Sequence, residues 1–423
     1  MAKNANNDRP TCATAGQVLS DNRVIDVVSQ PSGDLALAVY DGEKVEIVPK
    51  LTHEDITYIP RMPHPSVRAA MHFPSRIADQ VQLQPVFMKM VQLFCTYVAM
   101  LEPAAFLSAA CVIAGWVWEC FEALPIVCLT GANLGAATRL FRLLSAVSRR
   151  ALILGNITFQ VPMELHPTLL ILHSGLSQKQ LTTLRACSQR GVYLPSARGE
   201  LKAMDCAKAI YSEKDDLGRS WGDEAVCIGL LPQNSPVQLS DGALDAIADE
   251  FQPQLELFRL RRLYSRTKVH EGSCPADFAG SNFTRELWQL MRDEPEMPKL
   301  IQSIAEEQRE SIAARRALDP LTAILESIWM PSHNESQITM TDLQQRVNTL
   351  LQSRGERVEF GTREIGWKAK GLDLARERSA QGKILRFSSE IRAHIHRLAR
   401  QFGLTLQQVH GCADCAAMKK LAP

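Results

Sequence analysis

The stretch PIVCLTGANLGAAT, residues Pro125–Thr138, joins a short apolar run to a glycine-containing turn. The run Ile126–Thr130 has the length and composition of a buried strand. After the turn, Thr138–Arg149 repeats apolar side chains at three- and four-residue spacing, which is typical of an amphipathic helix. The sequence therefore predicts a strand, a glycine turn and a helix at the centre of an α/β domain.

This order of elements is also that of the phosphate-binding P-loop, whose pattern is Gly, four residues, then Gly-Lys-Ser/Thr. Gly131 and Thr138 match that pattern, but Ala136 stands in the place of the second glycine and Ala137 in that of the lysine. The lysine normally contacts the outer phosphates and the hydroxyl holds magnesium. Gly131, Gly135 and Thr138 are therefore the candidate nucleotide-binding residues of a P-loop-like motif that lacks the lysine.

The acidic partners of a P-loop are missing as well. A neighbouring apolar strand, Thr168–His173, should end in Asp-Glu, but Leu172 and His173 occupy those places. Losing the lysine and both acids removes the charge stabilisation, the metal anchor and the residue that orients water. We therefore predict no catalytic residues and no resident cofactor, while weak ATP and Mg²⁺ binding at the helix N-terminus stays open. We interpret His173 as a strand-end histidine rather than a substitute base, since no acid is nearby.

Residues 125–232 alternate strands and helices, which indicates a mainly parallel α/β sheet. Five strands are predicted: Ile126–Thr130, Ala151–Gly155, Thr168–His173, Ala207–Tyr211 and Ala225–Leu231. Helices over Val86–Met100, Ala104–Phe121 and Ser177–Gln189 should pack against this sheet. With these helices, the core domain is expected to span residues 85–270.

Composition and termini favour a cytoplasmic protein. The eleven cysteines are an odd number and lie mostly in apolar stretches, which suits a reducing compartment. The N-terminus lacks the apolar core of a signal peptide. Pro103–Cys120 is largely apolar but falls short of the roughly 20 residues that a spanning helix needs. We expect a buried helix there, and no membrane partner.

The N-terminal part is predicted to be small and rich in strands. We expect a disordered tail at residues 1–20 and a β-rich module at residues 21–75, with a hairpin turn at Asp41-Gly42. The proline-rich segment Tyr58–Pro74 should be an extended connection.

After the core strands, Asp241–Phe251 and Pro253–Tyr264 are predicted as two helices. The second carries a run of arginines that we interpret as a solvated helix end: Arg259, Arg261, Arg262 and Arg266. Contact with nucleic acid or another subunit is the alternative. Residues 271–317 should form an exposed helical connector.

Residues 318–404 form a separate unit in the order of a winged-helix domain. Helices over Leu321–Trp329, Met340–Ser353 and Thr362–Lys370 precede a hairpin with a Gln381-Gly382 turn, and Ser389–Gln401 is a final helix. In winged-helix proteins the third helix enters a DNA groove and the hairpin contacts the backbone. Residues 341–423 hold fifteen lysines and arginines against eight acidic residues, a net charge of +7, although the whole chain carries only +1.

DNA is therefore an expected partner of this unit. The candidate DNA-binding residues lie on the third helix and on the hairpin: Thr362, Arg363, Lys368, Lys370, Arg376, Arg378, Lys383 and Arg386. A winged helix that binds protein is the alternative.

The tail, residues 405–423, contains Cys412 and Cys415 in a Cys-x-x-Cys spacing, with His394, His396 and His410 upstream. Such residues can supply zinc ligands. A second tight pair, typical of a strong zinc site, is missing. We therefore predict no metal and interpret the cysteines as solvent-exposed free thiols.

The chain resembles the P-loop ATPase-like proteins of bacterial phages and mobile elements, which are related to primase-associated helicases. The matching stretches are Leu124–Arg150, Pro167–Gln189, Lys202–Tyr211 and Gln252–Leu255, and the resemblance extends over roughly residues 20–400. It implies a β-rich leader, a RecA/AAA-type core and a winged helix. Only Gly131 and Thr138 match the family's nucleotide-binding positions.

Three functions remain as hypotheses. The first is an inactive, pseudo-ATPase core that serves as a DNA-binding accessory factor in phage or mobile-element replication. The second is a divergent ATPase or helicase, working as a homo-oligomer with Arg261 or Arg262 acting in trans. The third is a scaffold for a partner ATPase.

Overall fold

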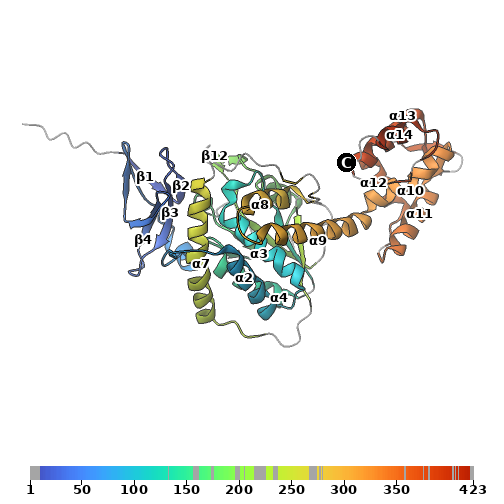
Figure 1. Ribbon diagram of the computed structural model, residues 1–423. Helices are drawn as coiled ribbons and strands as arrows, with labels where there is room; N and C mark the ends of the chain where they lie inside the picture. The colour runs from blue at the N-terminus through green and yellow to red at the C-terminus, as the bar shows by residue number, and fades with distance from the viewer. Residues whose placement is uncertain are drawn as a thin grey trace, which may run out of the picture. The chain divides into compact units, whose positions relative to one another are not determined.

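The computed structural model describes residues 10–131, 133–155, 162–172, 176–195, 201–203, 205–213, 225–231, 237–265, 274–275, 278, 280–356, 359–374, 376–379, 382–402, 404, 406–407 and 409–419. The chain divides into two compact units, Met1–Arg309 and Glu310–Pro423. The long helix α9 (Met297–Ala317) contains the boundary between them (Figure 1).

A five-stranded parallel sheet forms the centre of the first unit. In spatial order its strands are β14 (Ala225–Gly229), β8 (Ile126–Thr130), β13 (Lys208–Ser212), β10 (Leu169–Ile171) and β9 (Leu152–Leu154). All four neighbouring pairs are parallel, which confirms the expected parallel α/β sheet. Because β8 pairs on both edges, its register is fixed from both sides, with Cys128 opposite Ile210 and Cys227.

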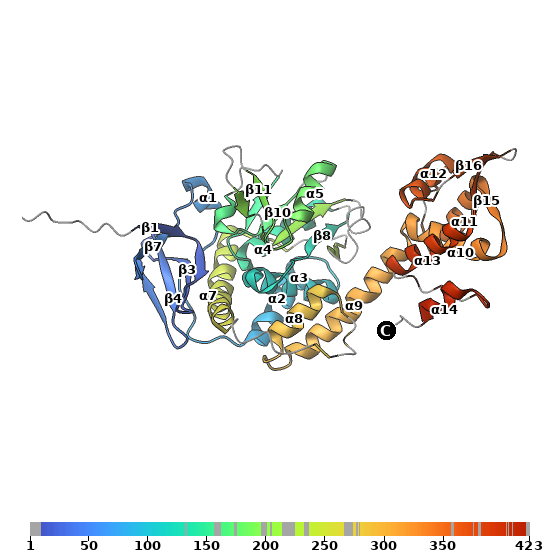
Figure 2. The ribbon, with the colours of Figure 1, turned by 90° about the horizontal axis from the view of Figure 1, so that it is seen from above.

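Helices cover both faces of this sheet, as the nearly uninterrupted apolar strands require. Val127 and Leu129 point into the core shared with helices α2 (Leu83–Tyr97), α3 (Glu102–Trp116), α4 (Leu134–Val147) and α7 (Asp241–Ser265). Ile126 and Cys128 point the other way, toward α5 (Gln178–Ala186). Figure 2 shows α5 on one side of the strands and α3 and α4 on the other.

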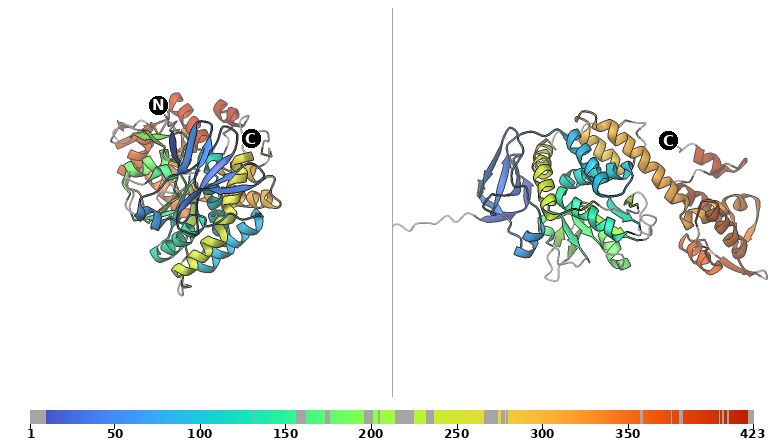
Figure 3. Two further views of the ribbon diagram at one scale, coloured as in Figure 1. Left: turned by 90° about the vertical axis from the view of Figure 1, so that its left-hand side faces the viewer. Right: turned by 90° about the horizontal axis from the view of Figure 1, so that it is seen from below.

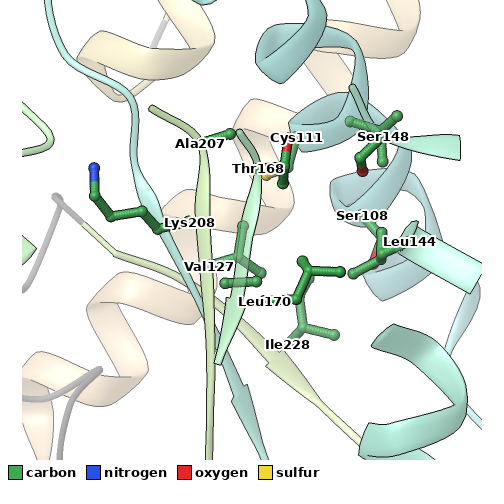
Figure 4. Close-up of a pocket in the computed structure, with 12 residues that line it drawn as sticks. Ser108, Cys111, Val127, Leu144, Ser148, Thr168, Leu170, Ala207, Lys208 and Ile228 are labelled. Atoms are coloured by element: carbon green, nitrogen blue, oxygen red, sulfur yellow. The ribbon is translucent and has the colours of Figure 1, made fainter. Parts of the chain in front are cut away.

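The expected buried helix of the apolar segment is α3, whose side chains are mostly buried in the core. Among the helices in the described residues, none combines the length and the apolar character needed to cross a membrane. A cavity of about 30 Å³ lies between α3 and the sheet (Figure 4). Three of its polar side chains, Ser108, Thr168 and Lys208, are bonded to backbone carbonyls, and Figure 4 shows the Lys208 ammonium turned away from it. The cavity is therefore a packing gap rather than a binding site.

The N-terminal module consists of two small sheets and one short helix. Its elements are β1 (Thr11–Thr14), β2 (Gly16–Val18), β3 (Val24–Ser29), β4 (Leu35–Tyr40), β5 (Val45–Val48), β6 (Leu51–His53), β7 (Ile56–Pro60) and α1 (Pro65–Ala70). The predicted meander is the antiparallel sheet β2-β3-β4-β5, whose turn between β4 and β5 contains Asp41-Gly42. The second sheet has the order β1-β7-β6, with β1 parallel to β7.

Two predictions for this module are wrong. Residues 11–18 lie in the segment expected to be disordered, yet they form β1 and β2. These strands are polar, so backbone pairing with β7 and β3, rather than an apolar pattern, holds them. The supposedly extended segment Tyr58–Pro74 contains the end of β7 and helix α1, which begins at Pro65 with a cap from His64.

Helix α7 connects the module to the core. It contacts β3 and β4 on one side and α4 and α3 on the other, and Figures 1 and 3 show it standing between them. It was predicted as two helices but runs unbroken through Pro253. Proline costs a helical hydrogen bond, and burial of α7 on both sides outweighs that cost.

The interpretation of the arginine run on α7 as a solvated helix end is wrong for Arg259 and Arg262. Arg259 is fully buried and contacts Asp26 on β3. It also donates two hydrogen bonds to Glu119, in the short 3-10 helix Trp118–Cys120. Arg262 pairs with Glu294 at 2.9 Å, Arg261 is exposed, and Arg266 lies outside the described residues.

The predicted connector is partly core. Helix α8 (Asn282–Met291) buries Phe283, Leu287 and Leu290 against the first unit, and α9 adds Ile301 and Ile304. The apolar residues of α8 recur with the 3.6-residue period of a helix. They therefore form one face that packs against the core, and α8 is not an exposed connector. Among its described residues, this unit also contains the 3-10 helix Met163–Leu165 and the hairpin of β11 (Tyr193–Pro195) and β12 (Leu201–Ala203).

The second unit has its own core. Its elements are α10 (Pro320–Asn334), β15 (Gln337–Thr339), α11 (Met340–Ser353), α12 (Thr362–Gly371), β16 (Arg376–Ser379), β17 (Gly382–Arg386), α13 (Ser389–Gln401) and α14 (Ala413–Lys419). The three helices, the hairpin and the final helix lie where predicted. Strand β15 was not predicted; it pairs antiparallel with β17 to give the order β15-β17-β16.

Candidate nucleic-acid interface

The glycine turn after β8 is short and tightly packed. Gly131 has φ +133°, and a Cβ there would lie 2.8 Å from the carbonyl oxygen of Leu230. This position therefore needs glycine for its conformation and for the close approach. The Tyr211 hydroxyl donates to the Gly131 carbonyl at 2.7 Å, which closes the turn from the neighbouring strand.

The helix after this turn begins earlier than predicted. Asn133 caps α4 by accepting from the Ala136 N–H at 3.0 Å, so the helix starts at Leu134 and not at Thr138. Only residues 131–133 separate strand and helix. Gly135 and Thr138 are therefore helical, and the Thr138 hydroxyl donates to the Leu134 carbonyl at 2.8 Å.

The chemistry around the turn is sparse. Ala136 and Ala137 are buried among apolar side chains. A surface hollow of about 400 Å³ lies beside Gly135 and Thr138. Arg142, in its wall, already donates to the Leu239 carbonyl and to Asp241. At the end of β10, Leu172 packs with the apolar core, while His173 lies outside the described residues.

In the second unit, α12 presents a basic and aromatic face to solvent. Ile365 and Ala369 face the core, whereas Thr362, Arg363 and Lys370 are exposed. Trp367, one turn beyond Arg363, is 57% exposed. The Arg363 guanidinium lies 4.7 Å from the centre of the Trp367 ring, a cation–π contact.

Lys368 has a different setting from its neighbours on α12. It is half-buried, and its ammonium lies 5.3 Å from the centre of the Phe360 ring, before the helix. Phe360 is itself held by Asn348 of α11, whose side-chain amide bonds both the Phe360 N–H and its carbonyl at 3.0 Å. Asn348 therefore holds the backbone just before α12, which fixes the direction in which this helix leaves the core.

The hairpin places further cations at the surface. Arg378, Lys383 and Arg386 are exposed on β16 and β17, and Arg386 pairs with Glu377 at 3.3 Å. Arg376 lies in β16 opposite Leu385, and its side chain lies outside the described part of the structure. Figure 2 shows α12 and β16 on the opposite side of this unit from α14.

Comparison of the chain with models of protein families gives no match. Comparison with curated proteins gives none either. Solved structures with some likeness include the A-form apo structure of the C-terminal region of NrS-1. It is 11% identical with a TM-score of 0.34, and the match covers 86% of this chain and 96% of that one.

A second A-form apo structure of that NrS-1 region is 13% identical with a TM-score of 0.33, over 86% of this chain and 96% of that one. The structure of Drosophila ORC bound to DNA is 16% identical with a TM-score of 0.17, over 81% of this chain and 96% of that one. Likeness this weak carries no functional conclusion.

Sequence reasoning found the basic residues of α12 and the hairpin but missed Trp367. The signal was present, because Arg363 and Trp367 are four residues apart and Ile365 and Ala369 mark the opposite face of the helix. Trp367 is thus an exposed aromatic side chain among the basic residues of α12.

Proposed function

We propose that the chain is a DNA-binding accessory protein whose second unit is a winged-helix domain. The order helix, strand, helix, helix, hairpin supports this, as does the pairing of β15 with β17 beside the hairpin. In that arrangement α12 is the helix that enters a groove, and β16 and β17 form the wing along the phosphate backbone.

The observation that carries the proposal is the exposed Arg363–Trp367 pair on α12. An exposed tryptophan forgoes the free energy that its burial would give, and beside arginines and lysines its ring offers an apolar surface to a nucleic-acid partner. In a duplex groove, arginine reads guanine edges or pairs with phosphate, and an aromatic ring can pack against thymine methyl groups. Lys370, a turn further along the same helix, adds charge toward the backbone.

For the first unit we propose an inactive relative of the RecA/AAA-type P-loop core. The parallel sheet with β8 inside it and the glycine turn after β8 support that ancestry. The alanines in place of the glycine and lysine, and the three-residue connection to α4, argue against a phosphate cradle. Together with the resemblance of Leu124–Arg150 and the other matching stretches to phage and mobile-element ATPase-like proteins, these features suit an accessory factor in phage or mobile-element replication.

Fluorescence anisotropy with full-length protein and labelled duplex DNA tests the DNA-binding role. We expect Trp367→Ala and Arg363→Ala each to weaken binding about tenfold, the effect of losing roughly 1–3 kcal/mol of contact. Arg346→Ala is the matched control, because Arg346 is an exposed arginine of the same unit that pairs with Glu335. Absence of binding at low salt, or equal binding by all four proteins, would refute the role of α12.

A further inference from the structure

Four side chains of the second unit converge on one point, and none of them is among the proposed DNA contacts. They come from α10, α13 and the start of α14: His333, His396, Cys412 and Cys415. All their ligand atoms lie within 4.8 Å of one another. Cys415 is 2% exposed and His396 is 1% exposed, so the expectation of two solvent-exposed thiols is wrong for Cys415.

Four separations within this cluster are close to those of ligands around a single ion. The two histidine Nε2 atoms are 3.2 Å apart. The Cys415 Sγ lies 3.3 Å from His396 Nε2 and 3.4 Å from His333 Nε2, and the Cys412 Sγ lies 3.5 Å from His396 Nε2. A tetrahedron with zinc–nitrogen and zinc–sulfur bonds of ordinary length requires about 3.3–3.8 Å between ligand atoms.

The hydrogen bonds of the outer ring nitrogens fix which nitrogens face inward. His333 Nδ1 lies 2.8 Å from the Trp329 carbonyl, and His396 Nδ1 lies 2.8 Å from the Arg392 carbonyl. A carbonyl can only accept, so each Nδ1 carries a proton, and when the rings are neutral each one points a bare Nε2 lone pair at the other. Metal-binding histidines have this second hydrogen bond almost always, because it fixes the tautomer and the ring orientation.

Two facing lone pairs at this separation repel unless a positive charge lies between them. The thiol groups of Cys412 and Cys415 could donate, but S–H is a weak donor. A divalent cation satisfies all four groups at once, with both thiols as thiolates. We therefore propose that His333, His396, Cys412 and Cys415 bind a structural Zn²⁺ ion.

The donor set selects the metal and the role. Two imidazoles and two thiolates in a tetrahedron favour zinc over the oxygen-seeking cations Mg²⁺ and Ca²⁺. Four protein ligands leave no open position for a water or a substrate, which makes the site structural rather than catalytic. It is distinct from the nearby histidines: His394 bonds the Leu372 carbonyl and His410 is exposed.

The site explains how the tail is fastened to the second unit. Its ligands join the end of α10, the middle of α13 and the Cys-x-x-Cys at α14, which are far apart in sequence. Trp329 contributes a further tie, since its ring nitrogen donates to the Gln407 carbonyl at 2.7 Å. Its ring centre also lies 4.6 Å from that of His396. Zinc would therefore lock α10, α13 and the tail into one body.

Metal analysis of full-length protein, expressed with zinc and purified under reducing conditions without chelator, tests this proposal. We expect one zinc ion per chain by mass spectrometry. After exchange for Co²⁺ we expect the intense visible bands of tetrahedral cobalt together with thiolate-to-cobalt charge transfer. Cys412→Ser/Cys415→Ser should abolish both signals, whereas the matched pair Cys12→Ser/Cys95→Ser, at exposed cysteines, should retain them. His333→Asn should lose zinc and His410→Asn should keep it.

Alkylation of the wild-type chain provides a readout that needs no variant to fold. We expect Cys412 and Cys415 to resist a thiol reagent until a chelator is added, while Cys12 and Cys95 react in both conditions. Zinc-free wild-type protein without a cobalt spectrum would overturn the proposal. So would equal zinc in wild type and the Cys412→Ser/Cys415→Ser variant, or alkylation of Cys412 that a chelator does not accelerate. DNA binding is not the readout, so failure here leaves the proposed function standing.

Discussion

Asp26 of β3 and Arg259 of α7 form a fully buried ion pair, with 2.5 Å between Asp26 Oδ2 and Arg259 Nε. Arg149 and Arg150, just after α4, also pair with Asp26. Burial alone would raise the pKa of Asp26, but the three guanidinium groups outweigh burial and hold it well below its usual range. One carboxylate thus ties the N-terminal module, α4 and α7 together.

Replacing this carboxylate should destabilise the first unit strongly. Asp26→Asn leaves the buried Arg149 and Arg150 without their counter-charge and Arg259 with Glu119 alone, and breaking a buried pair by removing one partner costs about 3–5 kcal/mol. Urea denaturation should show this loss in the free energy of unfolding. Asp55→Asn, at an exposed turn position, should change it by less than about 0.5 kcal/mol. Equal stabilities of the two variants would show that the pair contributes little.

Ionisation of Glu286 on α8 should make the free energy of unfolding depend on pH. Burial raises the pKa of Glu286 to about 7, from an ordinary value near 4.5. Between those values the folded chain holds a proton that the unfolded chain has lost, so this group's contribution to stability falls as the pH rises through that window. The isosteric Glu286→Gln keeps an acceptor for the Glu122 N–H but cannot ionise.

Thermal unfolding of wild type and Glu286→Gln from pH 5 to pH 8 measures this pH dependence. The melting temperature of the variant, relative to wild type, should rise across this range and level off above the folded pKa. Glu310→Gln, at an exposed position of α9, should give a flat difference. A flat difference for Glu286→Gln as well would mean that its carboxyl ionises normally.

Nucleotide should not bind or turn over at the turn after β8. The Thr138 hydroxyl is committed to the Leu134 carbonyl, and no lysine follows Gly135 to bridge phosphates. Calorimetry with ATP and Mg²⁺ should show no saturable heat, and Thr138→Ala should leave any background hydrolysis unchanged. Saturable binding that Thr138→Ala abolishes would instead favour the divergent ATPase.

The elements predicted well are helices with an amphipathic pattern sustained over several turns and strands with a continuous apolar run. Strand β8 and helices α11 and α13 have the predicted bounds. Strand β15 could not be predicted because it is three residues long and is defined by its pairing with β17. The local sequence pattern of a segment does not show which strand it will pair with.

The misread residues are those whose partners are distant in sequence. Arg259 appeared to end a charged helix, but its partner Asp26 lies 233 residues away. Cys415 was expected to be exposed but is buried, and its neighbour His333 lies 82 residues before it in the sequence. In both places the chemistry depends on tertiary contacts that spacing along the chain does not reveal.

The wing should control the salt dependence of DNA binding rather than its sequence preference. Each phosphate contact releases counterions and contributes about 0.9 to the slope of log affinity against log salt. Replacing Arg378, Lys383 and Arg386 together by alanine should therefore lower that slope by about 2–3 and weaken binding to all duplexes alike. Arg400→Ala, at an exposed position of α13, serves as a control that should leave the slope nearly unchanged. An unchanged slope in the triple variant would place the phosphate contacts elsewhere and refute the wing assignment.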